Sequence, residues 1–316
     1  MPRKKCSNDE LSEFIDTSDE WISKRSGIKN RYFVSADETT SDMACFAAKN
    51  ALENAQMSVN DIDLIIVATT TPDNTFPSTA TLVQKKLNIN AVSFDIQAVC
   101  AGFIFALSVA KSMIADGIYR NCIVIGADSM SKLLDWNDRT TSVLFGDGAG
   151  AVILQKLSNE NKKYDDWGIL SNVIHSDGQF YDLLKTNGGV SSNQKIGFIE
   201  MSGKEIFKHA VDKLSYSLNE ALKVSNKNIT EIDWLVPHQA NQRIISAVAD
   251  KMKIDINKVI STVKNHGNTS AASIPLALDH AVSSNKILNG NLIGMHAIGG
   301  GLSWGATIVR IGKPKF

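Results

Sequence analysis

Short apolar runs of strand length alternate with helical patterns along most of the chain. Residues 93–97 have the pattern of a buried strand, and residues 101–111 have that of an apolar helix. Strands that alternate with helices predict an α/β fold, in which helices cover the sheets. The longest apolar runs, such as Leu64–Ala68, have the length of strands, so we expect no segment to cross a membrane.

The two halves of the chain repeat the same series of elements. Matching segments begin at Ile62 and Ile232, at Cys100 and Asn268, and at Cys122 and Asn291. All three pairs are separated by about 170 residues, which indicates duplication rather than chance. A fourth pair, Gly150 and Gly305, lies closer together, so the first half should carry an extra loop around residues 128–146.

A duplicated chain of 316 residues predicts two similar halves, residues 1–160 and 161–316, that face each other across a central cleft. In such an arrangement the equivalent helix starts lie side by side at the cleft. Cys100, at the first of these helix starts, should then lie close to Asn268, at the second.

Composition argues against several classes of partner. The 33 basic and 33 acidic residues cancel, so the overall charge gives no reason to expect nucleic acid. The four cysteines form no CxxC pair, a usage typical of a reducing compartment. The basic start of the chain leads into polar sequence, unlike a signal peptide, so we expect a cytoplasmic protein.

Cys100 is the strongest candidate for chemistry. Unpaired N–H groups and the positive end of the dipole at a helix N-terminus favour a thiolate. A thiolate in this position can act as the nucleophile of acyl transfer. An isolated cysteine is more often an inert residue of the core, so this interpretation depends on the rest of the chain.

Three further residues support a site at the cleft. His238 follows a buried strand, where ligand crevices lie in α/β sheets, although a histidine bonded within a loop is the alternative. Asn268 opens a helix and could be its N-cap. Gly300 belongs to a glycine triplet that is either a tight hairpin turn or a means of bringing a backbone N–H close to an oxyanion.

A glycine-rich stretch at residues 145–150 lacks the GxGxxG spacing and the strand-to-helix context of a dinucleotide site. We therefore interpret its glycines as positions where two elements pack closely.

Six motifs follow one another in a characteristic order, at residues 16–22, 98–103, 146–150, 236–241, 266–273 and 299–305. Together they resemble β-ketoacyl-acyl-carrier-protein synthase III, the condensing enzymes that start bacterial fatty-acid synthesis. The resemblance extends from about residue 7 to about residue 310. It implies the thiolase fold, a five-layered αβαβα duplication, in agreement with the internal repeat.

The resemblance also implies a reaction. Cys100 would take the acetyl group from acetyl-CoA, and malonyl-acyl-carrier-protein would then lose CO2 to give an enolate held by His238 and Asn268. The N–H groups of Cys100 and Gly300 would form the oxyanion hole of the acyl-cysteine. Hydrogen-bond donors aimed at one oxygen can do this work, so we expect neither a metal nor another cofactor. Two acyl transfers on one thiol predict ping-pong kinetics.

By the same resemblance, CoA and its pantetheine arm would contact five residues: Thr17, Trp21, Arg25, Arg139 and Asn241. Trp21 and Arg139 would enclose the adenine, Arg25 would lie near the nucleotide phosphate, and Asn241 would reach the pantetheine. Stacking and cation–π contact suit these residue types.

Part of this set also has a local explanation. Thr17 and Glu20 have the spacing of a capping box, which would need no ligand. Trp21 and Arg25 lie four residues apart, on one face of the predicted helix, and could simply pack together.

The resemblance assigns Lys204, Lys208 and Arg243 to a surface that binds the acidic acyl carrier protein. A neutral net charge is compatible with such a local patch, although scattered surface lysines are the alternative. Phe76 would reach the acyl pocket of a partner subunit, so we expect a homodimer.

Several alternatives share parts of this pattern. A Cys-His-Asn set also occurs in acyl-CoA-primed polyketide, hydroxymethylglutaryl-CoA and quinolone-type synthases. A thiolase would carry a second cysteine near residues 299–301, and an elongating condensing enzyme would carry histidine in place of Asn268. Outside enzymes, the alternative is a noncatalytic scaffold that binds carrier protein. Acetyl is the expected primer. Whether longer or branched acyl groups are accepted depends on the depth of the acyl pocket.

The start of the chain departs from the family pattern. Members usually begin with a strand and a Gly-x-Gly-x-Tyr-Leu-Pro stretch before the position of Ser7, and we expect that strand to lie inside a sheet. Without it, backbone donors and acceptors would be exposed. The chain as written should therefore melt at a lower temperature than a version extended by this strand. Equal melting temperatures of the two versions would contradict the prediction.

Overall fold

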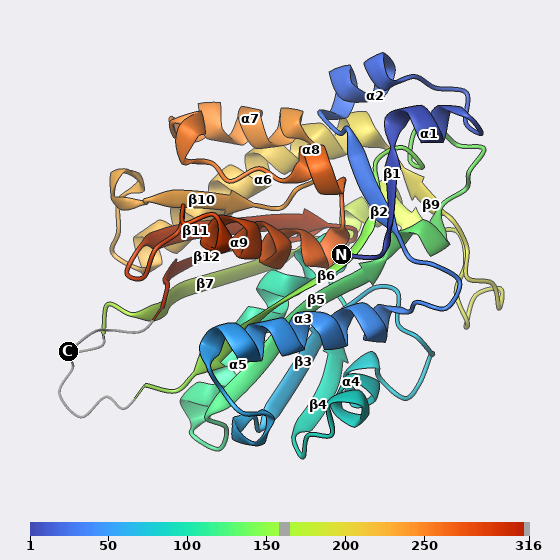
Figure 1. Cartoon of the computed structure of the whole chain (residues 1–316). Helices are drawn as coiled ribbons and strands as arrows, with labels where there is room; N and C mark the ends of the chain where they lie inside the picture. The colour runs from blue at the N-terminus through green and yellow to red at the C-terminus, as the bar shows by residue number, and fades with distance from the viewer. Residues whose placement is uncertain (158–164, 313–316) are drawn as a thin grey trace.

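The computed structural model describes residues 1–157 and 165–312, which form two mixed sheets and three layers of helices (Figure 1). The first sheet has the order β4-β3-β5-β6. Its strands are β3 (Leu64–Ala68), β4 (Val92–Ile96), β5 (Asn121–Ser129) and β6 (Asp147–Gln155). The first three strands are parallel, and β6 runs antiparallel to β5.

The second sheet repeats this arrangement, with the order β10-β11-β12-β7. Its strands are β7 (Gly168–Ser176), β10 (Trp234–Pro237), β11 (Leu292–Gly299) and β12 (Ser303–Arg310). β10 and β11 are parallel, β12 is antiparallel to β11, and a parallel bridge from Leu235 to Val259 takes the place that β4 has in the first sheet. The repeat predicted from the sequence is confirmed.

Helices α5 (Gly102–Asp116) and α9 (Ser273–Ser283) lie between the two sheets. Phe103, Ile104 and Leu107 of α5 pack in one core with Ile66 of β3 and Met295 of β11. Val99–Asp116 is longer than the strand-sized apolar runs noted in the sequence: by length and composition it could span a membrane, with a mean hydropathy of 1.6 over 18 residues, but half of it is buried inside the protein. A helix enclosed by apolar neighbours on several sides is apolar all round without contacting lipid.

Two further pairs of helices cover the outer faces. α3 (Thr40–Ala55) and α4 (Thr79–Leu87) pack on the first sheet, and α6 (Gly203–Val224) and α7 (Gln242–Met252) pack on the second (Figure 1). The layers therefore follow the predicted order αβαβα.

The remaining elements are short. Two strand pairs, β1 (Lys4–Ser7) with β2 (Asn30–Phe33) and β8 (Leu184–Thr186) with β9 (Ile199–Met201), lie outside the main sheets. The short α-helices are α1 (Asn8–Ser12), α2 (Asp19–Ser26) and α8 (Val263–His266). The 3-10 turns are η1 (Val59–Asp61), η2 (Val99–Ala101), η3 (Met130–Leu133), η4 (Gly178–Leu183), η5 (Ile229–Glu231), η6 (Ile256–Lys258) and η7 (Ser270–Ala272).

The sequence predicted a buried strand at 93–97, a helix at 101–111 and an extra loop in the first half. The strand at 93–97 is β4, but it is only half-buried, because it forms the edge of its sheet. The helix expected at 101–111 runs from Gly102 to Asp116. The extra loop of the first half is confirmed, since residues 130–146 join β5 to β6, whereas a turn at 300–302 joins β11 to β12.

The strand that flanks β12 in the second sheet is β7, and it lies at the edge of that sheet. The matching position in the first sheet, beside β6, is therefore also an edge, so the expectation of an interior strand was wrong. The predicted gain in stability from an N-terminal extension remains a prediction.

The glycine-rich stretch packs closely, as predicted. A Cβ on Gly146 would lie 2.7 Å from the carbonyl oxygen of His266, and one on Gly150 would lie 2.8 Å from the backbone nitrogen of Leu276. Real Cβ atoms essentially never come so close to backbone, so only glycine lets β6 rest against α9.

We expect Gly150→Ala to lower the free energy of unfolding by about 1–3 kcal/mol, because the added methyl group must push β6 away from the backbone of α9. Urea denaturation followed by circular dichroism measures this loss. The matched control is Gly178→Ala, since a Cβ there meets no atom within 4 Å. Equal stability of the two variants would show that the close contact between β6 and α9 does not restrict the size of the residue at position 150.

Candidate active site

Cys100 lies in the turn η2, between β4 and the start of α5. Its side chain is buried, and the end of β11 packs directly against its backbone: a Cβ on Gly299 would lie 2.7 Å from the Cys100 nitrogen. The preceding residue, Val99, has a φ of +48°, which is rare for a β-branched residue. Strain of this kind persists where the surrounding structure holds the backbone in place, and it is common at functional sites.

The expected thiolate at Cys100 is not what the structure favours. Burial raises the pKa of the Cys100 thiol to about 12, and the nearby Ser270 hydroxyl lowers it only in part. The charge of the buried Asp128 raises the pKa further. Loss of solvent therefore outweighs the helix N-terminus, and the resting side chain is a thiol.

His238 follows β10 directly, as expected, and its backbone N–H donates to the carbonyl oxygen of His296 at 2.8 Å. Burial, followed by the nearby His296, lowers the pKa of His238 to about 3, so the ring is neutral near pH 7. The Ser273 Oγ lies 2.7 Å from Nδ1 and accepts the N–H of Gln239 at 3.3 Å. If the Ser273 hydroxyl donates its own proton to Nδ1, Nε2 carries the proton of the neutral ring and acts as a donor.

Asn268 is held by its backbone between residues 144 and 146. Its N–H donates to the Leu144 oxygen at 2.9 Å, and its oxygen accepts the Gly146 N–H at 3.0 Å. The side-chain Oδ1 accepts the N–H of Ser270 at 2.9 Å, although Thr269, not Asn268, is the N-cap of η7. Among the hydrogen bonds of the described residues, its side chain takes part only through Oδ1, so the NH2 group is left to donate.

These residues converge from both halves, as the repeat predicted. Cys100 lies in η2, which packs against η7, where Ser270 follows Asn268 by two residues, and the His238 ring hydrogen-bonds to Ser273, three residues further on. Ser270 and Ser273 were not singled out from the sequence, although both lie in the motif at 266–273. Their contribution depends on which neighbours the turn η7 meets in the folded chain.

A cavity of about 310 Å3, here called the Cys100 cavity, opens beside the thiol and is lined by both Cys100 and Gly300. Its apolar lining includes Met130, Leu133, Phe145, Leu184 and Ile199. A Cβ on Gly300 would lie 2.6 Å from the Leu184 oxygen, so a side chain does not fit there. Sequence patterns did not identify the apolar lining, because such residues look like any other part of the core.

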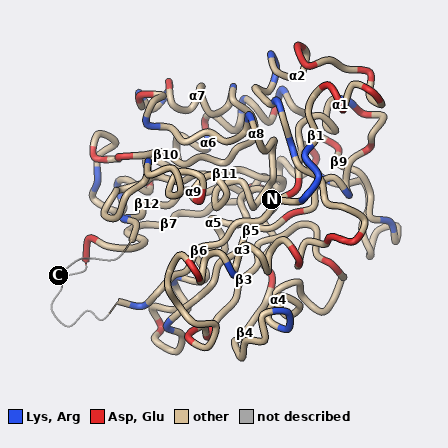
Figure 2. Tube along the Cα trace, in the orientation of Figure 1, with Lys and Arg blue, Asp and Glu red and all other residues tan. Residues whose placement is uncertain are grey.

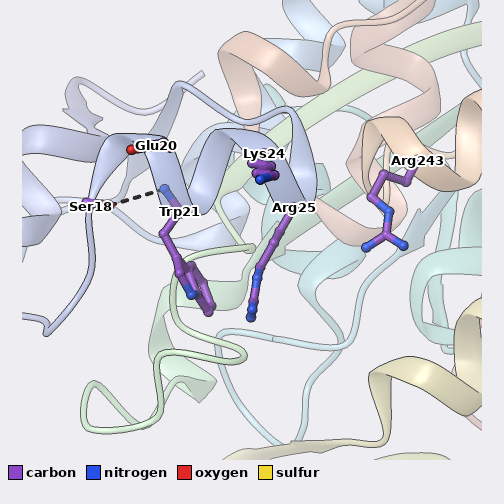
Figure 3. Close-up of a pocket in the computed structure, with 6 residues that line it drawn as sticks. All are labelled: Ser18, Glu20, Trp21, Lys24, Arg25 and Arg243. Carbon is purple, nitrogen blue, oxygen red and sulfur yellow. Dashed lines mark hydrogen bonds between the residues drawn. The ribbon is translucent and has the colours of Figure 1, made fainter.

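A second cavity, of about 570 Å3, lies beside α2 and is here called the α2 cavity (Figure 3). It is lined by Ser18, Glu20, Trp21, Lys24, Arg25 and Arg243. The Arg25 guanidinium lies 4.1 Å from the centre of the Trp21 ring, and that of Arg139 lies 5.2 Å from it. The predicted helix face is confirmed, and Arg139 joins it from the extra loop, where its Nη1 donates to the Asp16 carbonyl oxygen at 2.7 Å.

The capping box predicted from Thr17 and Glu20 is wrong. The N-cap of α2 is Ser18, whose hydroxyl accepts the N–H of Trp21 at 3.1 Å. The Thr17 hydroxyl is buried without a hydrogen-bond partner. The helix therefore starts one residue later than expected, with Ser18 and not Thr17 as its N-cap.

The other predicted residues lie at the surface. Asn241 is the N-cap of α7, and its Oδ1 accepts the N–H of Ile244 at 2.9 Å. Lys204 and Lys208 are exposed in the first two turns of α6 and line neither cavity, whereas Arg243 lies over the Phe207 ring at 5.4 Å and reaches the α2 cavity. Figure 2 shows that basic and acidic segments alternate over this region.

Phe76 is 83% exposed and lines neither cavity of its own chain. Among residues 1–157 and 165–312, no three His, Cys, Asp or Glu side chains are grouped to hold a metal ion. The expectation of a reaction without a metal or cofactor remains a prediction.

Comparison with known proteins gives a consistent result. Residues 94–178 match the family model of 3-oxoacyl-[acyl-carrier-protein] synthase III, and residues 222–311 match the model of its C-terminal part. The chain is 54% identical to the β-ketoacyl-[acyl-carrier-protein] synthase III of Wolbachia pipientis wMel over 312 residues, 98% of this chain and 96% of the relative. It is also 54% identical to the protein of that name from Ehrlichia canis, with the same coverage.

The fold has a counterpart among solved structures. The 3-oxoacyl-[acyl-carrier-protein] synthase III of Aquifex aeolicus VF5 superposes with a TM-score of 0.92 at 44% identity, covering 98% of this chain and 97% of that one.

Alkylation of Cys100 by iodoacetamide should accelerate about tenfold per pH unit from about pH 7 to about pH 9 without a plateau, because only the thiolate reacts and its pKa lies far above this range. Peptide mass spectrometry measures the modification at Cys100 separately from the other cysteines, and circular dichroism checks that the fold persists. A plateau below about pH 8 would show that the resting residue is already a thiolate.

Proposed function

Because the chain belongs to the 3-oxoacyl-[acyl-carrier-protein] synthase III family, we propose that it condenses acetyl-CoA with malonyl-acyl-carrier-protein, the step that initiates fatty-acid synthesis. The observation that carries this proposal is a cavity lined by Cys100, Gly300 and Phe145, where Asn268 pairs with Phe145 and the Ser273 hydroxyl, five residues after Asn268, hydrogen-bonds to His238. A polyketide-type synthase or a noncatalytic scaffold is not favoured, since the relatives at 54% identity are named β-ketoacyl-[acyl-carrier-protein] synthase III, whereas a priming ketosynthase of a polyketide pathway is 34% identical.

The first half-reaction transfers the acetyl group. The Cys100 sulfur attacks the carbonyl carbon of acetyl-CoA, the new carbon–sulfur bond forms, and the bond to the CoA sulfur breaks. The proton lost by the Cys100 thiol balances the one gained by the CoA thiolate. The N–H groups of Cys100 and Gly300 stabilise the oxyanion, and the closeness of Gly299 and Gly300 to other backbone supports their assignment.

The second half-reaction uses malonyl-acyl-carrier-protein. The bond to the malonyl carboxylate breaks and releases CO2, and its electron pair forms an enolate at the thioester. Nε2–H of His238 and the NH2 group of Asn268 donate to the enolate oxygen. The carbanion then attacks acetyl-Cys100, the bond to sulfur breaks, and acetoacetyl-acyl-carrier-protein leaves the thiol, which regains a proton.

The neutral state of His238 suits this role. A ring whose pKa is held at about 3 donates a hydrogen bond near pH 7 without carrying a charge. Burial also strengthens its interaction with the negative oxygen that develops in the transition state. No metal or other cofactor is needed for these steps, because two donors act on one oxygen.

The α2 cavity serves the nucleotide end of CoA. Trp21 provides an aromatic face for the adenine; Arg139, whose guanidinium lies 5.2 Å from the Trp21 ring centre, moves away to admit the base and covers its other face, and Arg25 lies near the phosphates. Asn241 contacts the pantetheine, and Thr17 lies beside the same site. Carrier protein binds at Lys204, Lys208 and Arg243, which lie on the adjacent helices α6 and α7.

We further propose that the enzyme is a cytoplasmic homodimer. Phe76 is 83% exposed, and β4 forms an edge of the first sheet, whose unpaired backbone groups can bond to a strand of a second copy. Phe76 would then close the Cys100 cavity of the partner. All four cysteines are free, which suits a reducing compartment.

Intact-protein mass spectrometry after mixing with acetyl-CoA tests the first half-reaction. We expect one added acetyl group on the parent protein and none on Cys100→Ala, because the thiol is the acceptor. A folded dimer that gains no acetyl group would contradict the proposal and direct attention to longer primers or to the scaffold alternative.

Ser273→Ala separates the two half-reactions. Loss of the hydrogen bond to Nδ1 of His238 should slow decarboxylation of malonyl-acyl-carrier-protein about fivefold, the equivalent of about 1 kcal/mol. Acetylation of Cys100 should proceed at the parent rate, since His238 is not assigned to that step. Equal slowing of both steps would instead show that Ser273 supports the site as a whole.

A further inference from the structure

The α2 cavity is lined by more cationic side chains than the proposed contacts with CoA account for. Three of its lining residues, Lys24, Arg25 and Arg243, are cations, and only Glu20 is acidic. Figure 3 shows that Trp21, Lys24 and Arg25 come from α2 and that Arg243 extends from α7 toward the side where Arg25 lies. Lys24 has so far been assigned no part in binding.

A close contact between two helices builds this cluster. Gly27, which ends α2, has a φ of +77°, and a Cβ there would lie 2.6 Å from the Cβ of Gln242 at the start of α7. The last turn of α2 can therefore press against the first turn of α7 only because residue 27 is glycine. This contact places Lys24 and Arg243 on one cavity although they are far apart in the sequence.

Lys24 is the cation of this cluster that has no protein partner. Arg25 lies over Trp21 and Arg243 lies over Phe207, whereas Lys24 makes no ion pair or cation–π contact within the described part of the chain. Other lysines do have partners: Lys29 pairs with Asp19 at 2.6 Å, and Lys251 pairs with Asp212. An exposed, unpaired ammonium beside an aromatic platform is available to an anionic ligand.

The two thioester substrates differ in their anionic groups. CoA carries a diphosphate and a phosphomonoester on its ribose, whereas the arm of the carrier protein has a single phosphodiester. We propose that Lys24 binds the ribose phosphomonoester of CoA and so makes the α2 cavity selective for CoA over other carriers of the same thioester. This inference rests on the proposed function and adds a specificity-determining residue to it.

Lys24→Gln tests the inference by titration calorimetry with CoA and with 3′-dephospho-CoA, which lacks the phosphomonoester. We expect the variant to bind CoA about fivefold more weakly and to bind 3′-dephospho-CoA with unchanged affinity, as for a partly exposed ion pair of about 1 kcal/mol. The matched control is Lys49→Gln, which removes the same charge from an exposed position on α3. Its affinities for both ligands should equal those of the parent.

Three results would overturn the inference. They are an equal loss of affinity for both ligands in Lys24→Gln, no loss for either ligand, or a higher KM for malonyl-acyl-carrier-protein with unchanged CoA binding. Acetylation of Cys100 by acetyl-3′-dephospho-CoA is measured in parallel. If that acetylation occurs while Lys24→Gln shows no selective loss, the inference fails and the proposed function stands; if Cys100 accepts no acetyl group even from acetyl-CoA, the proposed function itself fails.

Discussion

The site depends on backbone of one half resting directly against backbone of the other. A Cβ on Gly126 would overlap the carbonyl oxygen of Ala271, and Gly150 faces the backbone of α9 in the same way. Because these positions lack side chains, η7 and α9 approach the first sheet closely enough to bring Asn268 and Ser270 to Cys100. Interiors packed at this density adjust little, so the spacing of the donors is set by the sheets rather than by flexible loops.

The same burial sets the chemical state of the reacting groups. Removal of water raises the pKa of the Cys100 thiol to about 12 and lowers that of His238 to about 3, so both groups are neutral at rest. Charge then appears only as the reaction proceeds, first on the thioester oxygen and later on the enolate. Fixed N–H donors in a site with little water stabilise such transient charge more effectively than water does.

The proposed nucleotide site follows a different principle. Its binding groups are exposed cations and one half-buried indole, placed by the contact of α2 with α7. Each exposed charge contributes little binding free energy, but such charges distinguish ligands that differ by one phosphate group. The proposed chemistry and the proposed recognition of CoA thus belong to two cavities, one beside the buried Cys100 thiol and the other beside the cations of α2 and α7.

The order of strands and helices and the internal repeat could be predicted from the sequence, because they depend on local pattern, whereas the roles of Cys100, His238 and Asn268 stay predictions from motifs. The protonation state of the Cys100 thiol could not be predicted from the sequence. The position at a helix start favoured a thiolate, but the pKa also depends on how many atoms from distant segments exclude water. The apolar lining of the Cys100 cavity and the approach of Lys24 to Arg243 could not be predicted from the sequence for a similar reason. Which residues meet across a cavity is decided by contacts between elements far apart in the chain, and only the tertiary structure determines those.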